Sequence, residues 1–162
     1  MRKYFTLSLP RPPLRLIFLS GFGGFLAIAL LSMIGRYSHL PLIIAPFGAS
    51  CVLLFSAPAV PLSQPLNIVG GHVLTTLIGL IFLNLWPDFA LSPAIAVGIA
   101  IAAMVALRII HPPAGGNPLV VFAVQPGFDF VIMPVLMGAV LLVVIAVLFH
   151  RVGGTEYPVG RL

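Results

Sequence analysis

The chain has very few charged residues. Of its 162 residues only 7% are charged, whereas 60% are hydrophobic. A soluble domain usually carries about 25% charged residues, so this composition excludes an ordinary soluble globular domain. We therefore expect an integral membrane protein with almost no soluble part.

Acidic residues are the scarcest charged type, and all three (Asp88, Asp129 and Glu156) fall at predicted boundaries or in the tail. A cation transporter normally places an acid within the membrane, so the substrate is expected to be an anion or a neutral solute. The single cysteine, Cys51, excludes an internal disulfide.

Motifs of the common enzyme classes are also missing. The chain has no HExxH, no Walker loop, no GxSxG and no cluster of metal ligands. We therefore expect no enzymatic activity, no metal and no cofactor, and a membrane-embedded enzyme is the weakest reading.

The charges that are present lie at membrane-crossing intervals. From Asp88 to Arg151, successive charged residues are separated by 19 to 21 uncharged ones, and a hydrocarbon core of about 30 Å needs roughly 20 apolar residues in a helix. The predicted fold class is an all-α, polytopic transmembrane helix bundle. Full helices are expected at Leu14–Ile34, Asn67–Trp86, Leu91–Ile110 and Phe130–Phe149, with shorter apolar segments at Leu42–Ala57 and His111–Val124.

The bundle is expected to form one domain, residues 14–150, between an N-terminal arm (1–13) and a C-terminal tail (151–162). Basic residues gather before the first span and after the last: Arg2, Lys3, Arg11, Arg15, Arg151 and Arg161. This distribution fits positive-inside anchoring rather than a nucleic-acid patch. It predicts a multi-pass protein of the bacterial inner membrane with both termini in the cytoplasm.

An internal repeat relates two short stretches, Ile44–Phe55 and His111–Phe122. They align without a gap, and each is followed by a Gln-Pro pair. This predicts two pseudo-repeats of long helix, short Pro/Gly-interrupted helix and long helix. If the short elements cross the bilayer there are six spans and inverted halves; if they dip in and return there are four spans and parallel halves. We favour six.

Paired interrupted segments point to the binding site of a transporter. Proline in the first turn of a helix, followed by glycine and a small polar residue, leaves unpaired amides whose partial positive charge suits an anion. The predicted substrate-binding residues are Gly48, Ala49 and Ser50 in the first stretch and Gly115, Gly116 and Asn117 in the second. The alternative is that these stretches only kink helices for packing.

Two histidines and an asparagine complete the predicted site. His111 directly precedes the second stretch, and His72 follows two glycines in a predicted helix. Histidine titrates near physiological pH, so either residue is a candidate to carry a proton with the anion; the alternative is a neutral imidazole that fixes a loop. Asn67 is expected to donate a hydrogen bond to the substrate, or else to satisfy backbone groups.

The stretch from His111 to Leu119, HPPAGGNPL, resembles the HPP family of integral membrane proteins, which is named for its first three residues. A second block, from Pro46 to Phe55 and on to His72, resembles the family's other shared block. The resemblance implies a small multi-span bundle, and members in cyanobacteria and chloroplasts are associated with nitrite transport.

The expected function is therefore a transporter or channel for a small monovalent anion, most plausibly nitrite. The lipid bilayer and further copies of the chain are the expected partners, because one protomer is small for an enclosed pathway. The alternative is a non-transporting scaffold or assembly subunit of a membrane complex.

Overall fold

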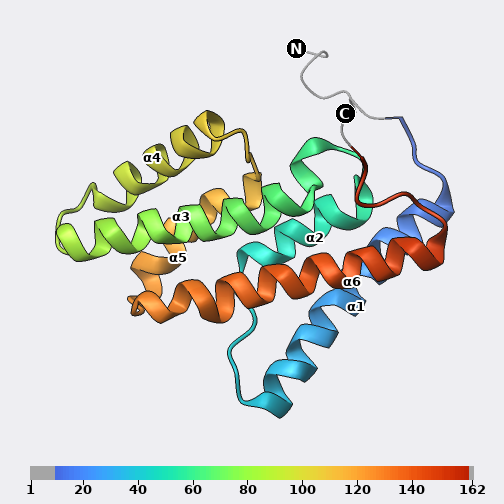
Figure 1. Cartoon of the computed structure of the whole chain (residues 1–162), viewed down its shortest axis with the longest axis horizontal. Helices are drawn as coiled ribbons and strands as arrows, with labels where there is room; N and C mark the ends of the chain where they lie inside the picture. The colour runs from blue at the N-terminus through green and yellow to red at the C-terminus, as the bar shows by residue number, and fades with distance from the viewer. Residues whose placement is uncertain (1–9, 161–162) are drawn as a thin grey trace.

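The computed structural model describes residues 10–160, which fold into helices joined by loops, with no strand in that range (Figure 1). The α-helices are α1 (Leu14–Ser38), α2 (Pro46–Ser56), α3 (Pro65–Leu85), α4 (Ser92–Ala106), α5 (Asn117–Val124) and α6 (Met137–Gly153). Tighter or wider turns form η2 (Pro61–Ser63), η3 (Pro112–Gly116), η4 (Phe128–Val131) and η5 (Ile132–Leu136). The all-α class is confirmed.

Three helical segments are long and apolar enough to cross a membrane: Leu14–Ser38, Pro65–Leu85 and Phe128–Gly153. Helix α4 has 15 residues. At 1.5 Å per residue it reaches about 22 Å, against a hydrocarbon core of about 30 Å. Helices α2 and α5 have 11 and 8 residues, so each covers only about half of that core. The lengths do not give the six spans that we favoured from the sequence, because α2 and α5 are half-helices.

The two half-helices start near the centre of the molecule and run toward opposite ends (Figure 1). Helices α3 and α6 pack against each other and run in opposite directions. Each half of the chain contains a helix, a half-helix and a long helix in that order. The equivalence of the two halves stays a prediction.

The main hydrophobic core lies where α1, α2 and α6 meet, and glycine permits the closest approaches. A methyl group at Gly138 of α6 would lie 2.6 Å from the carbonyl oxygen of Leu42, just before α2. At Gly23 of α1 it would lie 2.7 Å from Cγ of Phe55. Small residues at such crossings are how membrane helices approach closely. Buried members of the core include Ala27, Leu31, Phe47, Leu54, Leu142 and Ala146.

Several predicted helix ends are wrong by a few residues. Helix α1 continues to Ser38, where His39 takes a left-handed conformation (φ 58°). Helix α4 ends early at Ala106, because Arg108 turns the chain with φ 59°. Neither turn contains the glycine that usually marks a left-handed helix end, so no local signal predicts where these two helices stop.

The last helix also differs from the predicted Phe130–Phe149. The chain enters it through η4 and η5, and Met133, just before Pro134, has non-helical angles (φ −132°, ψ 114°). Regular helix then runs from Met137 to Gly153 and ends at Gly154 with φ 71°. The helix therefore extends past the predicted end at Phe149 and includes His150.

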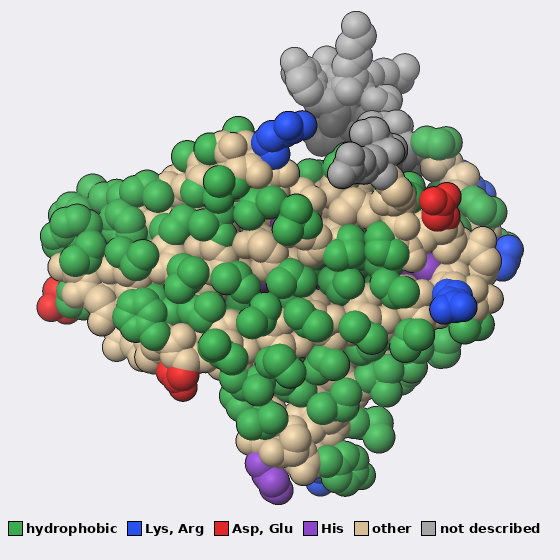
Figure 2. All heavy atoms as spheres, viewed as in Figure 1, with side chains coloured by type: hydrophobic (Ala, Val, Ile, Leu, Met, Phe, Trp, Pro, Cys, Tyr) green, Lys and Arg blue, Asp and Glu red, His purple; other side chains and the backbone are tan. Residues whose placement is uncertain are grey.

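The visible face of the molecule is largely hydrophobic, with charged side chains at its edges (Figure 2). Large apolar side chains such as Phe18 and Phe25 are 71% and 68% exposed, as expected for a surface that faces lipid. The start of α1 and the end of α6 lie together, because Arg15 and Thr155 line one pocket. The two described ends therefore lie on the same side of the bundle. Arg2, Lys3 and Arg161, which entered the orientation argument, lie outside the described residues.

Candidate functional site

The two Pro/Gly elements meet in the interior of the molecule. A methyl group added at Gly116, which directly precedes α5, would lie 3.8 Å from Cγ of Pro46, the first residue of α2. Helix α2 also packs against η3. The starts of both half-helices therefore converge, although about 70 residues of chain separate them.

The backbone amides at these starts are not free. The N–H groups of Phe47 and Gly48 donate to the carbonyls of Ile44 (3.0 Å) and Ala45 (3.1 Å). On the other side, Ala114 donates to His111 (3.0 Å). The expectation of bare amides is wrong for these three groups, because the chain enters each helix through a tight turn. The peptide dipoles still point their positive ends at the meeting place, but an anion there would need donors other than these three amides.

Ser50 lies at the centre of a buried polar network. Its Oγ lies 2.9 Å from Nε2 of His72 and 2.9 Å from Nε2 of His111. It also lies 3.3 Å from the carbonyl oxygen of Pro46. All three side chains are fully buried. One hydroxyl thus joins α2, α3 and the segment before η3.

Asn117 and a backbone carbonyl extend the network at its two ends. The Asn117 Nδ2 donates to Oγ1 of Thr76 (2.9 Å) and to the carbonyl of His72 (3.0 Å), and lies 3.0 Å from Nδ1 of His72. At the far end, Nδ1 of His111 lies 2.8 Å from the carbonyl oxygen of Leu62. In residues 10–160 no buried side-chain nitrogen or oxygen lacks a hydrogen-bond partner.

Close packing holds the two imidazoles in place. Their ring centroids are 5.1 Å apart, and the ring of Phe47 meets His72 edge-on at 5.1 Å. A methyl group at Gly71 would lie 3.0 Å from Cβ of His111, so a larger residue there would push the chain at His111 away from α3. The three acidic residues of the chain are exposed. The centre of the site is therefore polar and hydrogen-bonded, but built from neutral residue types.

The structure brings together four of the predicted site residues, Ser50, His72, His111 and Asn117, in direct contact. The glycines Gly115 and Gly116 are half-buried beside them, whereas Gly48 and Ala49 are exposed on the outer side of α2. Asn67 is not in the network. Its Nδ2 donates to the carbonyl of Ile110 (3.0 Å) and steadies the loop that leads into His111.

Sequence reasoning assigned no role to Thr76 or to the Leu62 carbonyl. A signal for Thr76 existed, because it lies four residues after His72 and so on the same face of α3. Nothing in the sequence indicates the carbonyl, since that contact joins residues 49 positions apart.

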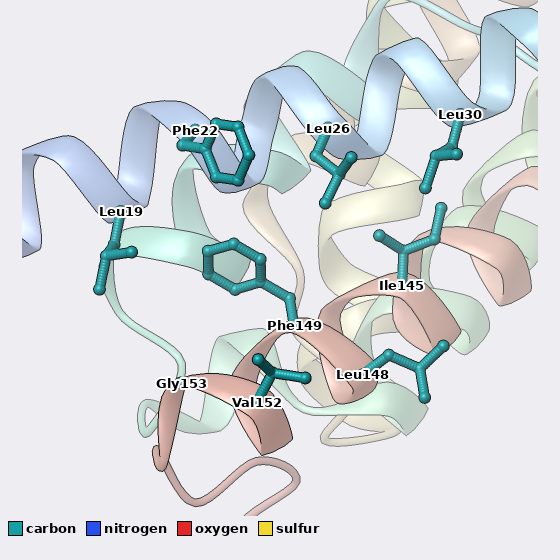
Figure 3. Close-up of a pocket in the computed structure, with 9 residues that line it drawn as sticks. All are labelled: Leu19, Phe22, Leu26, Leu30, Ile145, Leu148, Phe149, Val152 and Gly153. Carbon is teal, nitrogen blue, oxygen red and sulfur yellow. The ribbon is translucent and has the colours of Figure 1, made fainter.

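Two grooves lie on the surface of the bundle near these elements. One, of about 410 Å³, lies between α1 and α2 and is lined by Ser20, Gly21, Gly24, Phe25, Ile28, Gly48, Cys51, Val52 and Ser56. It reaches the exposed start of α2. The other, also about 410 Å³, lies between α1 and α6 (Figure 3). Apart from Gly153, its lining consists of leucine, isoleucine, valine and phenylalanine side chains, so it offers no side-chain donor to an anion.

A second polar cluster fastens the end of the chain, and sequence reasoning missed it. Nε2 of His150 donates to the carbonyl of Leu54 (2.8 Å), and the Tyr157 hydroxyl donates to the carbonyl of Ser63 (2.9 Å). The rings of His150 and Tyr157 lie 5.4 Å apart. Burial raises the pKa of the Tyr157 phenol well above its usual value. This cluster ties the tail to the link between α2 and α3.

Comparison with known proteins places the chain in a family. The model of the transmembrane region of the HPP family matches residues 9–158. Two curated proteins of Dictyostelium discoideum are similar. Transmembrane protein DDB_G0269096 is 32% identical over 144 residues, which are 82% of this chain and 50% of the relative. Transmembrane protein DDB_G0273707/DDB_G0273361 is 33% identical over 153 residues, which are 87% of this chain and 49% of the relative.

The chain thus spans about half the length of these curated relatives. No solved structure matches it. The family match covers nearly all of the described helices, including both half-helices and the polar network between them. This chain belongs to the HPP transmembrane family.

Proposed function

We propose that this protein moves a small monovalent anion across a membrane, with nitrite as the first candidate. The observation that carries the proposal is the meeting of two half-helix starts over a buried network of Ser50, His72, His111 and Asn117. Broken helices that begin at a shared buried point are the usual way in which membrane transporters build a substrate site.

Electrostatics favours an anion over a cation at this point. Helices α2 and α5 both direct the positive ends of their dipoles toward it. The side chains supply hydroxyl, amide and imidazole donors, whereas the acids that a cation would need are exposed elsewhere. Nitrite is small and accepts hydrogen bonds through two oxygens, and the family resemblance points to it independently.

The network is closed in this conformation, because every one of its side chains is buried and hydrogen-bonded. Transport then requires the anion to replace an internal hydrogen bond rather than to enter an empty space. The groove between α1 and α2 is the candidate route of approach, since two residues that line it, Gly48 and Cys51, lie on either side of Ser50 in the sequence.

The same proposal includes the membrane in which the protein lies, its orientation and its oligomeric state. We place it in a bacterial inner membrane with both termini cytoplasmic, and we expect a homo-oligomer. Arg15 and Thr155 line the same pocket, which supports placing both ends of the bundle on one side of the membrane. The extensive apolar surface supports contact with lipid and with further copies of the chain.

The direct test is uptake by purified protein in proteoliposomes, with nitrite, nitrate, formate and chloride in competition. The variant Asn117→Leu should lower the apparent anion affinity by about tenfold or more, since one good hydrogen bond to a charged group contributes about 1.5–3 kcal/mol. Asn84→Leu is the matched control, because Asn84 is also helical but donates only to Leu80 one turn back. Membrane insertion of both variants is checked first. Unchanged affinity in Asn117→Leu would remove that residue from the site.

One observation favours a second function, that of a non-transporting scaffold or assembly subunit. The complete pairing of buried polar atoms is what a purely structural network needs. This reading predicts that liposomes move none of the four anions. It also predicts that Gly48→Ala and Gly115→Ala are silent, since a methyl group at either position meets no atom within 4 Å. Flat uptake for all four anions would refute the transport proposal.

A further inference from the structure

We propose that the histidine pair bridged by Ser50 binds one proton for each anion carried, so that transport is a one-to-one, electroneutral symport. This inference rests on the proposed function. It concerns the coupling ion and its stoichiometry, and it follows from which nitrogen of each imidazole carries hydrogen.

The tautomers are set by the partners at the ends of the network. A carbonyl only accepts, so the 2.8 Å contact with Leu62 requires hydrogen on Nδ1 of His111. Neutral His111 then has a bare Nε2, which accepts the single hydrogen of the Ser50 hydroxyl at 2.9 Å. The equal contact of Ser50 with His72 must therefore run the other way, with Nε2–H of His72 donating to Oγ.

His72 is left with a bare Nδ1, which lies 3.0 Å from Nδ2 of Asn117 and competes for its two hydrogens with Oγ1 of Thr76 and the His72 carbonyl. The hydrogen bonds thus run in one direction from His72 through Ser50 to His111 and the Leu62 carbonyl. With both rings neutral, this is the one arrangement in which both Nε2 contacts of Ser50 are hydrogen bonds and His111 keeps its bond to the Leu62 carbonyl.

The same network accommodates one additional proton without leaving a group unpaired. If the proton binds Nδ1 of His72, that nitrogen can donate to Oδ1 of Asn117, which lies 3.3 Å away. It can also be relayed. His72 then passes its Nε2 hydrogen to Ser50, and Ser50 passes its own hydrogen to Nε2 of His111. One proton has entered at His72, one positive charge stands on His111, and the Ser50 hydroxyl now donates back to His72.

A second proton has no place. It would put a positive charge on each of two rings whose centroids are only 5.1 Å apart. Ser50 would then accept from both rings and donate to Pro46, at 3.3 Å, with no negative group in the network. The capacity of the pair is therefore one proton.

No fixed acid offsets that charge. Around the pair, α2 contributes Ser50 and the neighbouring Cys51, which lines the groove toward α1. His150 of α6 is engaged with Leu54, and Asp129 of η4 is exposed. An unpaired buried charge is costly, so the anion at the helix starts and the proton on the pair stabilise each other. Each raises the affinity for the other by the same factor.

The test is accumulation of nitrite in proteoliposomes under a proton gradient. A one-to-one symport reaches an anion ratio equal to the proton ratio, about tenfold for each pH unit. An imposed potassium diffusion potential with valinomycin should leave this ratio unchanged. Nitrous acid that diffuses passively reaches the same ratio, so the readout is the initial rate of uptake above that of protein-free liposomes.

His72→Gln keeps a hydrogen-bonding side chain but removes the titrating ring, so gradient-driven accumulation should be lost. His150→Gln is the matched control, since His150 is also buried and hydrogen-bonded but lies outside the network; it should accumulate nitrite like the parent protein. If the parent exchanges labelled nitrite but the pH gradient does not speed its uptake above that of protein-free liposomes, the symport inference fails and the proposed function stands. If nothing moves, both fail.

Nitrogen-15 spectra of the histidines give a readout that does not depend on transport. At neutral pH His111 should be the Nδ1–H tautomer and His72 the Nε2–H tautomer. The opposite tautomer at His111 would overturn the inference even if uptake follows the gradient.

Discussion

The substitution Ser50→Ala tests most directly whether the polar network holds the centre of the molecule together. It removes one oxygen atom that lies 2.9 Å from Nε2 of both His72 and His111. The side chains around it are fully buried. The donor on one imidazole and the acceptor on the other then lose their partners together.

The size of the effect follows from that geometry. A buried polar group left without a partner costs about 1–3 kcal/mol. Two such groups lower the free energy of unfolding by about 2–6 kcal/mol, which changes the folding equilibrium by at least about 30-fold. A single rearranged water between the rings would bring the loss toward the lower limit.

The assay is reversible unfolding of the purified protein in mixed micelles, followed by tryptophan fluorescence and helical circular dichroism. Ser56→Ala is the matched control, because it makes the same change in the same helix. Its hydroxyl is exposed and donates only to Val52, one turn back, so it should change stability by less than about 0.5 kcal/mol. A loss in Ser50→Ala no larger than that in the control would refute the reasoning.

Further predictions concern glycine packing and the C-terminal cluster. Gly138→Ala should destabilise the fold by about 1–3 kcal/mol, since the new methyl group meets the Leu42 carbonyl oxygen at 2.6 Å; Gly98→Ala, with nothing within 4 Å, is the neutral control in the same unfolding assay. Tyr157→Phe should lose about 1 kcal/mol with its bond to Ser63 and speed proteolysis of the tail. Because burial raises the pKa of Tyr157, its contribution should be full below pH about 10 and decline as pH rises further. Proteolysis of Tyr157→Phe should lack that alkaline increase, and an identical pH profile in both proteins would contradict the argument.

Much of the helical framework could be predicted from the sequence. The spacing of charges from Asp129 to Arg151 matches the span Phe128–Gly153, and the prolines at Pro46 and Pro112 mark where helices restart. These signals are local, because hydropathy and the missing amide hydrogen of proline act within one helix. They predicted the two interrupted elements and the candidate residues around them.

The rest depends on tertiary contacts that no local signal encodes. Ser50, His72 and His111 were each predicted to face a substrate, but their hydrogen bonds to one another follow from the packing of α2, α3 and η3. The amides of Phe47 and Gly48 were expected to be free, and tight turns pair them instead. The half-helices were favoured as short spans, but their lengths show that each reaches only part of the way across.

The hydrogen-bond pattern itself argues for transport over a purely structural role. Ser50 has one hydroxyl hydrogen and two acceptors, the Pro46 carbonyl at 3.3 Å and the bare Nε2 of His111 at 2.9 Å. Asn117 Nδ2 has two hydrogens and three acceptors within 3.0 Å. A network that only braces helices needs no more acceptors than hydrogens, whereas this one has spare acceptors around Ser50 and Asn117. In such a network a donor can turn from an internal acceptor to an entering anion while the other donors keep their acceptors. Anion binding then need not leave a buried donor unpaired.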